Sequence, residues 1–293
     1  MGESSARSQT AESVAACRAS HFLHAERPLV FEDPYAIELL GQEWRERSLA
    51  DGGEIRQHPT TCVILGRSRY TEDQLEAAVR LGVDQYVILG AGLDTFALRR
   101  PDLMETISVY EIDTPATQEW KRERLAKLVD ELPAALEFIP TDLEHETIAE
   151  ALARSSFRSD RLAFFSWLGS TVYLSREGVF RTLKSIAAAS APGSEIFFDY
   201  CVSDEFITEQ EDIPIAHVVY EYTAQVGEPH TAFFNPQTLP NEVGAVGFEV
   251  IENLSPKQMD ERYFIGRSDG LRVATYCYYI HLRNSGKVGH QQS

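Results

Sequence analysis

The stretch QYVILGAGLDTFALRR, residues 85–100, decides the fold class. Residues 85–90 form a short β-branched and aromatic run that stops at a glycine, which predicts a buried strand. Gly90 and Gly92 follow at once, and a glycine turn after a first strand lets a ligand approach the backbone. The third glycine of the G-x-G-x-x-G motif is absent, and Asp94 stands near the expected start of the next helix. A carboxylate there would repel a pyrophosphate but could accept hydrogen bonds from backbone N–H groups or attract a cation. The turn therefore indicates nucleotide-type binding, with a tight structural turn as the alternative.

Strands and helices alternate outward from this turn. The expected strands are 85–90, 107–113, 136–140, 161–169 and 194–200, and the expected helices among them are 115–130, 144–153 and 175–193. This order predicts right-handed βαβ units and a parallel sheet. Residues 248–254 and 272–283 are predicted as closing strands without a helix between them, which indicates an antiparallel pair at the sheet edge.

Further helical patterns lie outside this alternation. Those at 10–26, 31–41 and 62–82 predict an N-terminal helical cap over residues 1–84. A core follows over residues 85–285, with an acidic helical insertion at about 203–235 that we interpret as a lid. Because no linker or repeat separates these parts, we expect one structural domain.

Composition excludes several classes of protein. The 293 residues include 27 basic and 45 acidic side chains, so the formal charge is −18, which disfavours nucleic acid and anionic membranes as partners. The four cysteines, Cys17, Cys62, Cys201 and Cys277, show no C-x-x-C spacing and no metal-ligand pattern. The chain shows no secretory signal and no apolar run of the roughly 20 residues that span a bilayer. We therefore expect a cytoplasmic protein without a metal.

Acidic residues end the second and third predicted strands. Asp113 lies about 20 residues after the glycines, where a carboxylate can bind ribose hydroxyls, and Glu111 is expected on the same face. The alternative for Asp113 is a cap on the helix that follows. Asp142 and Leu143 follow the third strand, where the acid can accept an adenine amino hydrogen and the leucine can pack on the ring. The alternative for Asp142 is a helix N-cap.

These motifs together resemble the leucine carboxyl methyltransferase-like family of S-adenosylmethionine (SAM)-dependent O-methyltransferases, especially its bacterial branch for polyketide and other natural-product tailoring. The resemblance covers roughly residues 10–285 and rests on TAESVAACRASH, FEDPYAIELLG, RSRYTED, QYVILGAGLDTFALR, VYEIDTP, TDL, FSWLGSTVYLS and APGSEIFFDY. It implies a Rossmann-like class I methyltransferase fold of the α/β class. That fold has a seven-stranded, mostly parallel sheet with an antiparallel last strand, here with the helical cap and the lid.

The resemblance also implies a cofactor and its ligands. SAM would be the methyl donor, with S-adenosylhomocysteine (SAH) as its product. Arg67 would pair with the methionine carboxylate, because a guanidinium binds a carboxylate through two hydrogen bonds. The other expected cofactor residues are Gly90, Ala91, Gly92, Asp94, Glu111, Asp113, Asp142, Leu143 and Ser166.

One position departs from part of the family. Members resembling the protein-carboxyl enzymes carry a glutamate five residues before a tyrosine, and here Leu168 precedes Tyr173 in that place. The change removes a carboxylate that could bind the SAM amino group, so a backbone carbonyl near Gly90 or Ser166 is the expected substitute. It also argues against a protein C-terminus as the substrate.

The acceptor is expected to be a small metabolite with a carboxylate or a hydroxyl group. A carboxylate needs no general base, whereas a phenol or alcohol is helped by one. The candidates are His230, His217 and Tyr173, and Asp199 and Tyr200 are less favoured; ordinary structural roles are the alternative for both histidines. An aromatic acceptor pocket is expected from Tyr220, Tyr222, Phe233 and Phe234.

Other functions stay open at this point. Within the enzyme class the alternative is a protein C-terminal carboxyl methyltransferase, and outside it a catalytically silent SAM-binding protein. An NAD(P)-dependent oxidoreductase is disfavoured because the third glycine and a Tyr-x-x-x-Lys pair are both missing. The assembly is expected to be a monomer or a homodimer.

Overall fold

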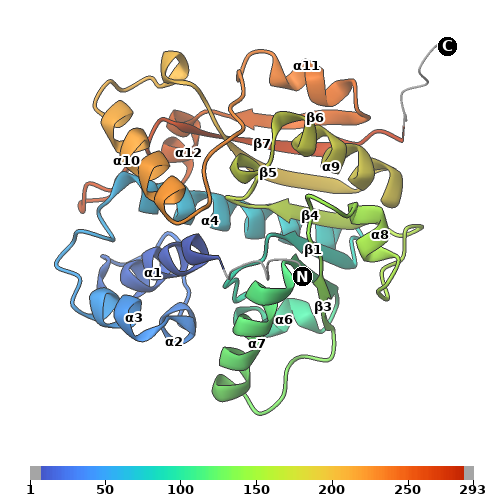
Figure 1. Ribbon diagram of the computed structural model, residues 1–293, viewed down its shortest axis with the longest axis horizontal. Coiled ribbons are helices and arrows are strands. Elements are labelled where there is room, and N and C mark those ends of the chain that lie inside the picture. Colours follow the sequence, from blue (N-terminus) through green and yellow to red (C-terminus); the bar gives the residue numbers. More distant parts are fainter. Residues whose placement is uncertain (1–7, 287–293) are drawn as a thin grey trace.

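A seven-stranded sheet forms the centre of the computed structural model, which describes residues 8–286 (Figure 1). The strand order is β3-β2-β1-β4-β5-β7-β6. Strands β1 to β5 run parallel, and β7 runs antiparallel to both β5 and β6. The strands are β1 (Gln85–Leu89), β2 (Ser108–Asp113), β3 (Leu136–Pro140), β4 (Ala163–Trp167), β5 (Glu195–Cys201), β6 (Phe248–Leu254) and β7 (Cys277–Asn284). The predicted Rossmann-like sheet with an antiparallel last strand is thus confirmed.

The helices surround this sheet. They are α1 (Gln9–His24), α2 (Ala36–Leu39), α3 (Gln42–Leu49), α4 (Pro59–Arg80), α5 (Phe96–Arg99), α6 (Pro101–Met104), α7 (Pro115–Leu128), α8 (Ile148–Leu152), α9 (Arg176–Ala189), α10 (Asp212–Gln225), α11 (Leu239–Gly244) and α12 (Pro256–Tyr263). Two short 3-10 turns complete the set, η1 (Thr171–Tyr173) and η2 (Asp204–Phe206). In residues 8–286, no helix combines the length and the apolar character that a membrane crossing requires.

Strands β1 and β4 are the innermost part of the molecule. Every residue of both strands is buried, which is why their sequences are mostly apolar, with Gln85 and Ser166 as the polar exceptions. The two strands pair in register from Gln85 with Ala163 to Leu89 with Trp167. The strand order changes direction between β1 and β4, and doubly wound sheets bind ligands outside the carboxyl ends of the strands at such a point.

The closing part of the sheet differs from the prediction. Helix α12 lies between β6 and β7, where no helix was expected, and Ser255 and Gln258 form a capping box at its start. The last strand begins at Cys277 rather than at residue 272. The carboxylate of Asp212 accepts hydrogen bonds from the backbone and hydroxyl of Thr275, which holds this segment out of the ladder.

Two other expected helices are short. The helix after the glycine turn, α5, has four residues and ends before Pro101, because the residue before a proline is disfavoured in helical conformation. No long helix therefore begins at the turn. In place of the helix expected at 31–41, the structure has only α2. The side chain of Asp33 accepts hydrogen bonds from the backbone N–H groups of Tyr35 and Ala36, just before and at the start of this helix.

The N-terminal helices divide between two cores. Helices α1 and α2 pack with α7 around a small cluster that contains Ala15, Ala19 and Leu39. Helix α4 belongs to the main core through residues such as Leu65 and Tyr70, and it contacts β4 and β5. The domain boundary expected at residue 84 stays a prediction. In the expected lid, the helical pattern read from residue 203 becomes α10, which begins at Asp212 after η2.

Candidate functional site

A cavity of about 710 Å³ lies at the carboxyl ends of β1, β2 and β4. Strand ends contribute Leu89, Asp113 and Trp167 to its wall. Loops and helix ends complete the wall, with residues drawn from the segments 8–18, 67–68, 88–94, 113–117, 141–144, 167–174 and 226–231. Residues from motifs that are far apart in the sequence thus line one cavity, at the point where the strand order changes direction.

The glycine turn forms one wall of this cavity. Gly90 and Gly92 have φ angles of +62° and +48°, a region that favours glycine. A Cβ atom on Gly90 would lie 2.5 Å from the hydroxyl oxygen of Ser170, and one on Gly92 would lie 3.2 Å from the Cβ of Ala11. The Ser170 hydroxyl is buried without a hydrogen-bond partner in the described structure. The turn therefore presents bare backbone and Ala91 to a ligand.

Asp113 holds the turn in place and lines the cavity. Its carboxylate accepts hydrogen bonds from the backbone N–H of Gly92 at 2.6 Å and of Thr114 at 2.7 Å. Burial raises the pKa of this carboxyl, while these two bonds act in the opposite direction. The two roles considered from the sequence are compatible, because the bond to Thr114 lies at the start of α7 and the side chain still faces the cavity.

The structure corrects the prediction that Glu111 binds the cofactor. It is expected among the cofactor residues, but it is 1% exposed, lies outside the cavity wall, and forms a buried ion pair with Lys121 of α7. Although Glu111 and Asp113 share a face of β2, only Asp113 reaches the end of the strand, and α7 covers the middle. Burial raises the pKa of Glu111.

Asp142 and Leu143 line the cavity beside Thr141, at the end of β3. Asp142 accepts a hydrogen bond from the backbone of Glu144 at 3.0 Å and contacts His145 at 2.9 Å. It is not a helix N-cap, because α8 begins later and is capped by Thr147. This end of the cavity is open to water, since Asp142 is half-exposed.

Two guanidinium groups line the cavity, and both are already paired. Arg67 of α4 binds Asp199 of β5, with 2.7 Å between Nη1 and Oδ2, and lies against Gly169. Arg18 of α1 binds Asp33 at 2.8 Å and donates to the backbone carbonyl of Leu93 at 2.7 Å. Sequence reasoning did not single out Arg18, although it lies in the motif TAESVAACRASH.

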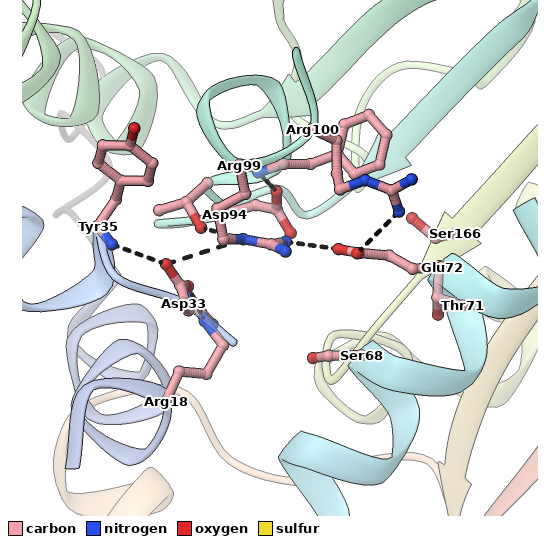
Figure 2. Close-up of polar contacts among 12 residues, drawn as sticks. Arg18, Asp33, Tyr35, Ser68, Thr71, Glu72, Asp94, Arg99, Arg100 and Ser166 are labelled. Carbon is pink, nitrogen blue, oxygen red and sulfur yellow. Dashed lines mark hydrogen bonds and ion pairs between the residues drawn. The ribbon is translucent and has the colours of Figure 1, made fainter. Parts of the chain in front are cut away.

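Figure 2 shows that Arg18 belongs to a longer chain of charges beside the glycine turn. Asp33 also lies 3.8 Å from Arg99, and Arg99 binds Glu72 of α4 at 2.6 Å. Arg100 extends the chain from the other side of Glu72, at 3.4 Å. Buried charges of this kind are stable only when they are paired, so α1, α4 and α5 are held in one arrangement.

Asp94 and Ser166 also appear in Figure 2, and only Asp94 belongs to the cavity wall. Asp94 lines the cavity and accepts a hydrogen bond from the backbone of Phe96 at 2.6 Å, as expected for an acid near a helix start. Ser166 is a correction, because it is fully buried in β4, pairs with the Tyr86 hydroxyl at 2.8 Å and lies outside the cavity wall. Leu168 does line the cavity, so an apolar side chain stands at the position where the resemblance implies a glutamate in part of the family.

The candidate bases are separated by the structure. Tyr173 lines the cavity, and burial raises its pKa to about 12, so its hydroxyl is protonated at neutral pH. His230 lies behind Tyr173, with ring centroids 5.6 Å apart, and is not part of the wall. His217 is a correction, because it is exposed on α10 and pairs with Asp204 at 3.0 Å.

The remaining candidates on the acceptor side also lie elsewhere. The Tyr200 hydroxyl donates to Asn253 at 2.7 Å, and Asp199 is bound to Arg67 and to the backbone of Gly169. The expected aromatic pocket is a further correction. Its four residues, Tyr220, Tyr222, Phe233 and Phe234, lie outside the cavity wall, and two of them pack around His230. No group of three or more His, Cys, Asp or Glu side chains in residues 8–286 is arranged to hold a metal ion.

Comparisons with known proteins show the family of the chain. The profile of the leucine carboxyl methyltransferase family matches residues 11–187. YktD of Bacillus subtilis (strain 168), by name a candidate S-adenosyl-L-methionine-dependent methyltransferase, is 34% identical over 236 residues, covering 80% of this chain and 76% of YktD. A protein of Mycobacterium avium (strain 104) with the same description is 36% identical over 203 residues, covering 65% of each chain.

The fold has a counterpart among solved structures. A candidate methyltransferase from Thermobifida fusca YX superposes with a TM-score of 0.61 at 15% identity, covering 96% of each chain. This likeness concerns the fold alone and agrees with the class I methyltransferase sheet expected from the sequence. On the family profile and the similarity to YktD, the chain belongs to the leucine carboxyl methyltransferase family and is a SAM-dependent methyltransferase.

Proposed function

We propose that this methyltransferase modifies an oxygen atom, in a carboxylate or a hydroxyl group, of a small metabolite of the polyketide or other secondary-metabolite type. The observation that carries the proposal is the cavity of about 710 Å³ at the strand ends, which falls within the usual range of roughly 300–1,000 Å³ for small-molecule sites. Its wall joins the expected SAM residues to Tyr173, Leu174 and Thr231, which we assign to the acceptor side.

The described residues fit SAM in charge and shape. We assign Arg67 to the methionine carboxylate, Asp113 to the ribose hydroxyls, and Asp142 with Leu143 to adenine. Gly90 fits a ligand held against the backbone, because a Cβ atom there would meet Ser170, and the unpaired Ser170 hydroxyl faces the same region. SAM supplies a methyl group on a positively charged sulfur, so it is already activated for transfer to a nucleophile.

The chain's own contribution is therefore to orient the acceptor and to exclude water. Tyr173 can donate a hydrogen bond to an acceptor oxygen, because its raised pKa keeps it protonated. His230 lies outside the cavity wall, so it is not placed to remove a proton from an acceptor directly. This arrangement favours acceptors that need little help from a base, such as carboxylates and acidic phenols.

A second candidate is methylation of a protein C-terminal carboxylate. The family profile supports it, whereas Leu168 on the cavity wall argues against it. A silent SAM-binding protein is the third candidate. The second and third candidates both predict SAM binding. The second transfers the methyl group to a protein, whereas the third transfers it to no acceptor.

The first experiment is isothermal titration with SAH, comparing the unmodified chain with Asp113→Ala and Asp160→Ala. Asp160 is an exposed acid paired only with Arg158 outside the cavity, so it is a matched control. We expect micromolar binding that is lost in Asp113→Ala and kept in Asp160→Ala. A screen with isotope-labelled SAM then compares aromatic carboxylic acids, phenols and peptides that end in leucine. No SAH binding by the unmodified chain would contradict the cofactor site, and transfer only to the peptides would favour the second candidate.

A further inference from the structure

The first turn of α1 and the loop after α10 are joined across the cavity by one side chain. Glu228 accepts a hydrogen bond from the backbone N–H of Gln9 at 3.0 Å and another from the Ser8 hydroxyl at 3.2 Å. The hydroxyl of Thr10 donates to the same carboxylate. Ser8, Gln9, Thr10 and Glu228 all line the cavity. A carboxylate at this point also matches the partial positive charge of a helix N-terminus.

The other side of this turn is fixed to the sheet domain. The backbone N–H of Ser8 donates to the Thr117 hydroxyl of α7 at 3.1 Å. The Cβ of Ala11 lies over Gly92, at 3.2 Å from the position of an added Cβ. Residues 8–11, which we name the strap, therefore pass from α7 over the glycine turn to Glu228.

The strap also reaches the acceptor side. Tyr173 lines the same cavity as Thr10, and the Thr10 side chain is close enough to offset part of the rise that burial causes in the pKa of Tyr173. Thr231, three residues after Glu228, is anchored to η1 through a bond from its backbone N–H to the carbonyl of Val172 at 2.7 Å. The strap, Glu228 and Tyr173 thus form one connected wall.

We propose that Glu228 is a positioning residue that closes the strap over bound SAM, and that SAM and SAH exchange when its bonds to the strap break. The inference rests on the proposed SAM site. The cavity wall at this side consists of the strap and residues 226–229, and Glu228 supplies three hydrogen bonds between them. Opening on the side of Arg18 or Arg67 would require breaking their buried ion pairs. The competing route is the half-exposed end at Asp142, where the cofactor could leave without moving the strap.

The test measures the rates of SAH binding by stopped-flow fluorescence. Trp167 lines the cavity and is fully buried, so its emission reports binding. We expect Glu228→Gln to raise both the association and the dissociation rate constants about tenfold, because charge-assisted hydrogen bonds to the strap are lost. The dissociation constant should change less than threefold. Glu228→Asp should give intermediate rates, because it keeps the charge at a shorter reach.

The matched control is Glu150→Gln. Glu150 accepts bonds from the backbone and hydroxyl of Thr147 at the start of α8, away from the cavity, so it repeats the same chemistry at another helix. We expect its SAH rates to equal those of the unmodified chain. Unchanged rates in Glu228→Gln would overturn the proposal and favour exchange at Asp142. A rise in the dissociation rate alone would also overturn it, because it would indicate a lost ligand contact or general loosening. No SAH binding by the unmodified chain would instead contradict the proposed function.

Discussion

The buried pair of Arg67 and Asp199 allows a direct test of where the methionine carboxylate binds. The two side chains are 9% and 5% exposed, and 2.7 Å separates Nη1 from Oδ2. Asp199→Asn keeps the shape and removes the charge, which leaves the guanidinium uncompensated. Breaking a buried pair in this way costs about 3–5 kcal/mol of unfolding free energy. We therefore expect the melting temperature to fall by roughly 5–15 °C.

The same substitution should strengthen binding of a ligand that carries a carboxylate to Arg67. At an effective dielectric constant of about 20, two unit charges roughly 4 Å apart interact by about 4 kcal/mol. A bound carboxylate recovers part of this interaction in the variant, whereas in the unmodified chain it competes with Asp199. We expect SAH to bind about tenfold more tightly, which corresponds to about 1.4 kcal/mol. 5′-Methylthioadenosine has the adenosyl part without the carboxylate, so its affinity should stay within about twofold.

The assay is isothermal titration of both ligands, with thermal unfolding recorded on the same samples. The reasoning is refuted if SAH and 5′-methylthioadenosine change together, or if stability falls while SAH affinity does not rise. Because Asp199 also accepts a hydrogen bond from Gly169, a distorted loop would weaken both ligands. Arg67→Met provides the reciprocal measurement: SAH affinity should fall at least 30-fold, while that of 5′-methylthioadenosine is kept.

Three further outcomes are expected. Gly90→Ala places a methyl group 2.5 Å from the Ser170 hydroxyl oxygen at a φ of +62°, so the variant should lose stability and SAH titration should show lost binding. The double variant Gly90→Ala with Ser170→Gly should recover only part of the stability, because it removes the steric contact but not the backbone strain. Lys121→Met removes the charge that lowers the pKa of Glu111, so this pKa rises further and Glu111 must take up a proton when the chain folds. Urea unfolding should therefore show a loss of about 3–5 kcal/mol at pH 8.5 and a smaller loss at pH 5.5, where Glu111 is protonated in either case. Burial lowers the pKa of His21 to about 4, below its value in the unfolded chain. Its contribution of roughly 3 kcal/mol to the free energy of unfolding is therefore present above pH 6.5 and is lost as the pH falls toward 4. His21→Gln should remove this part of the pH dependence of unfolding.

The central strands and the acids that follow them could be predicted because their signals are local. A parallel strand buried on both faces reads as a continuous apolar run, and the rule that ligands bind at strand ends selects Asp113 and Asp142. Helix α12 was missed because its eight residues are mostly polar and only Pro256 and Met259 are buried. Its capping box was nevertheless a readable signal.

The residues that the sequence did not reveal depend on contacts between distant segments. Arg18 meets the carbonyl of Leu93 across 75 positions, and Glu228 meets Ser8 across 220. No local pattern marks such pairs in a single sequence. The error at Glu111 has a different origin, because a period of two gives the face of a strand but not the depth at which a helix covers it.

The stretch 85–100 is longer than a glycine turn requires, and the charge network supplies a reason. Arg99 does not line the cavity, yet it lies between Asp33 and Glu72, and each of these two acids positions a helix that carries a cavity guanidinium. Asp33 holds Arg18 on α1, while Glu72 lies on α4 five residues after Arg67. A change at Arg99 would leave both acids buried with fewer partners, and it would move Arg18 and Arg67 relative to the turn that receives the rest of the ligand. The motif that places the glycines at the end of β1 therefore also helps to position Arg67, which we assign to the methionine carboxylate, and Arg18 on the cavity wall.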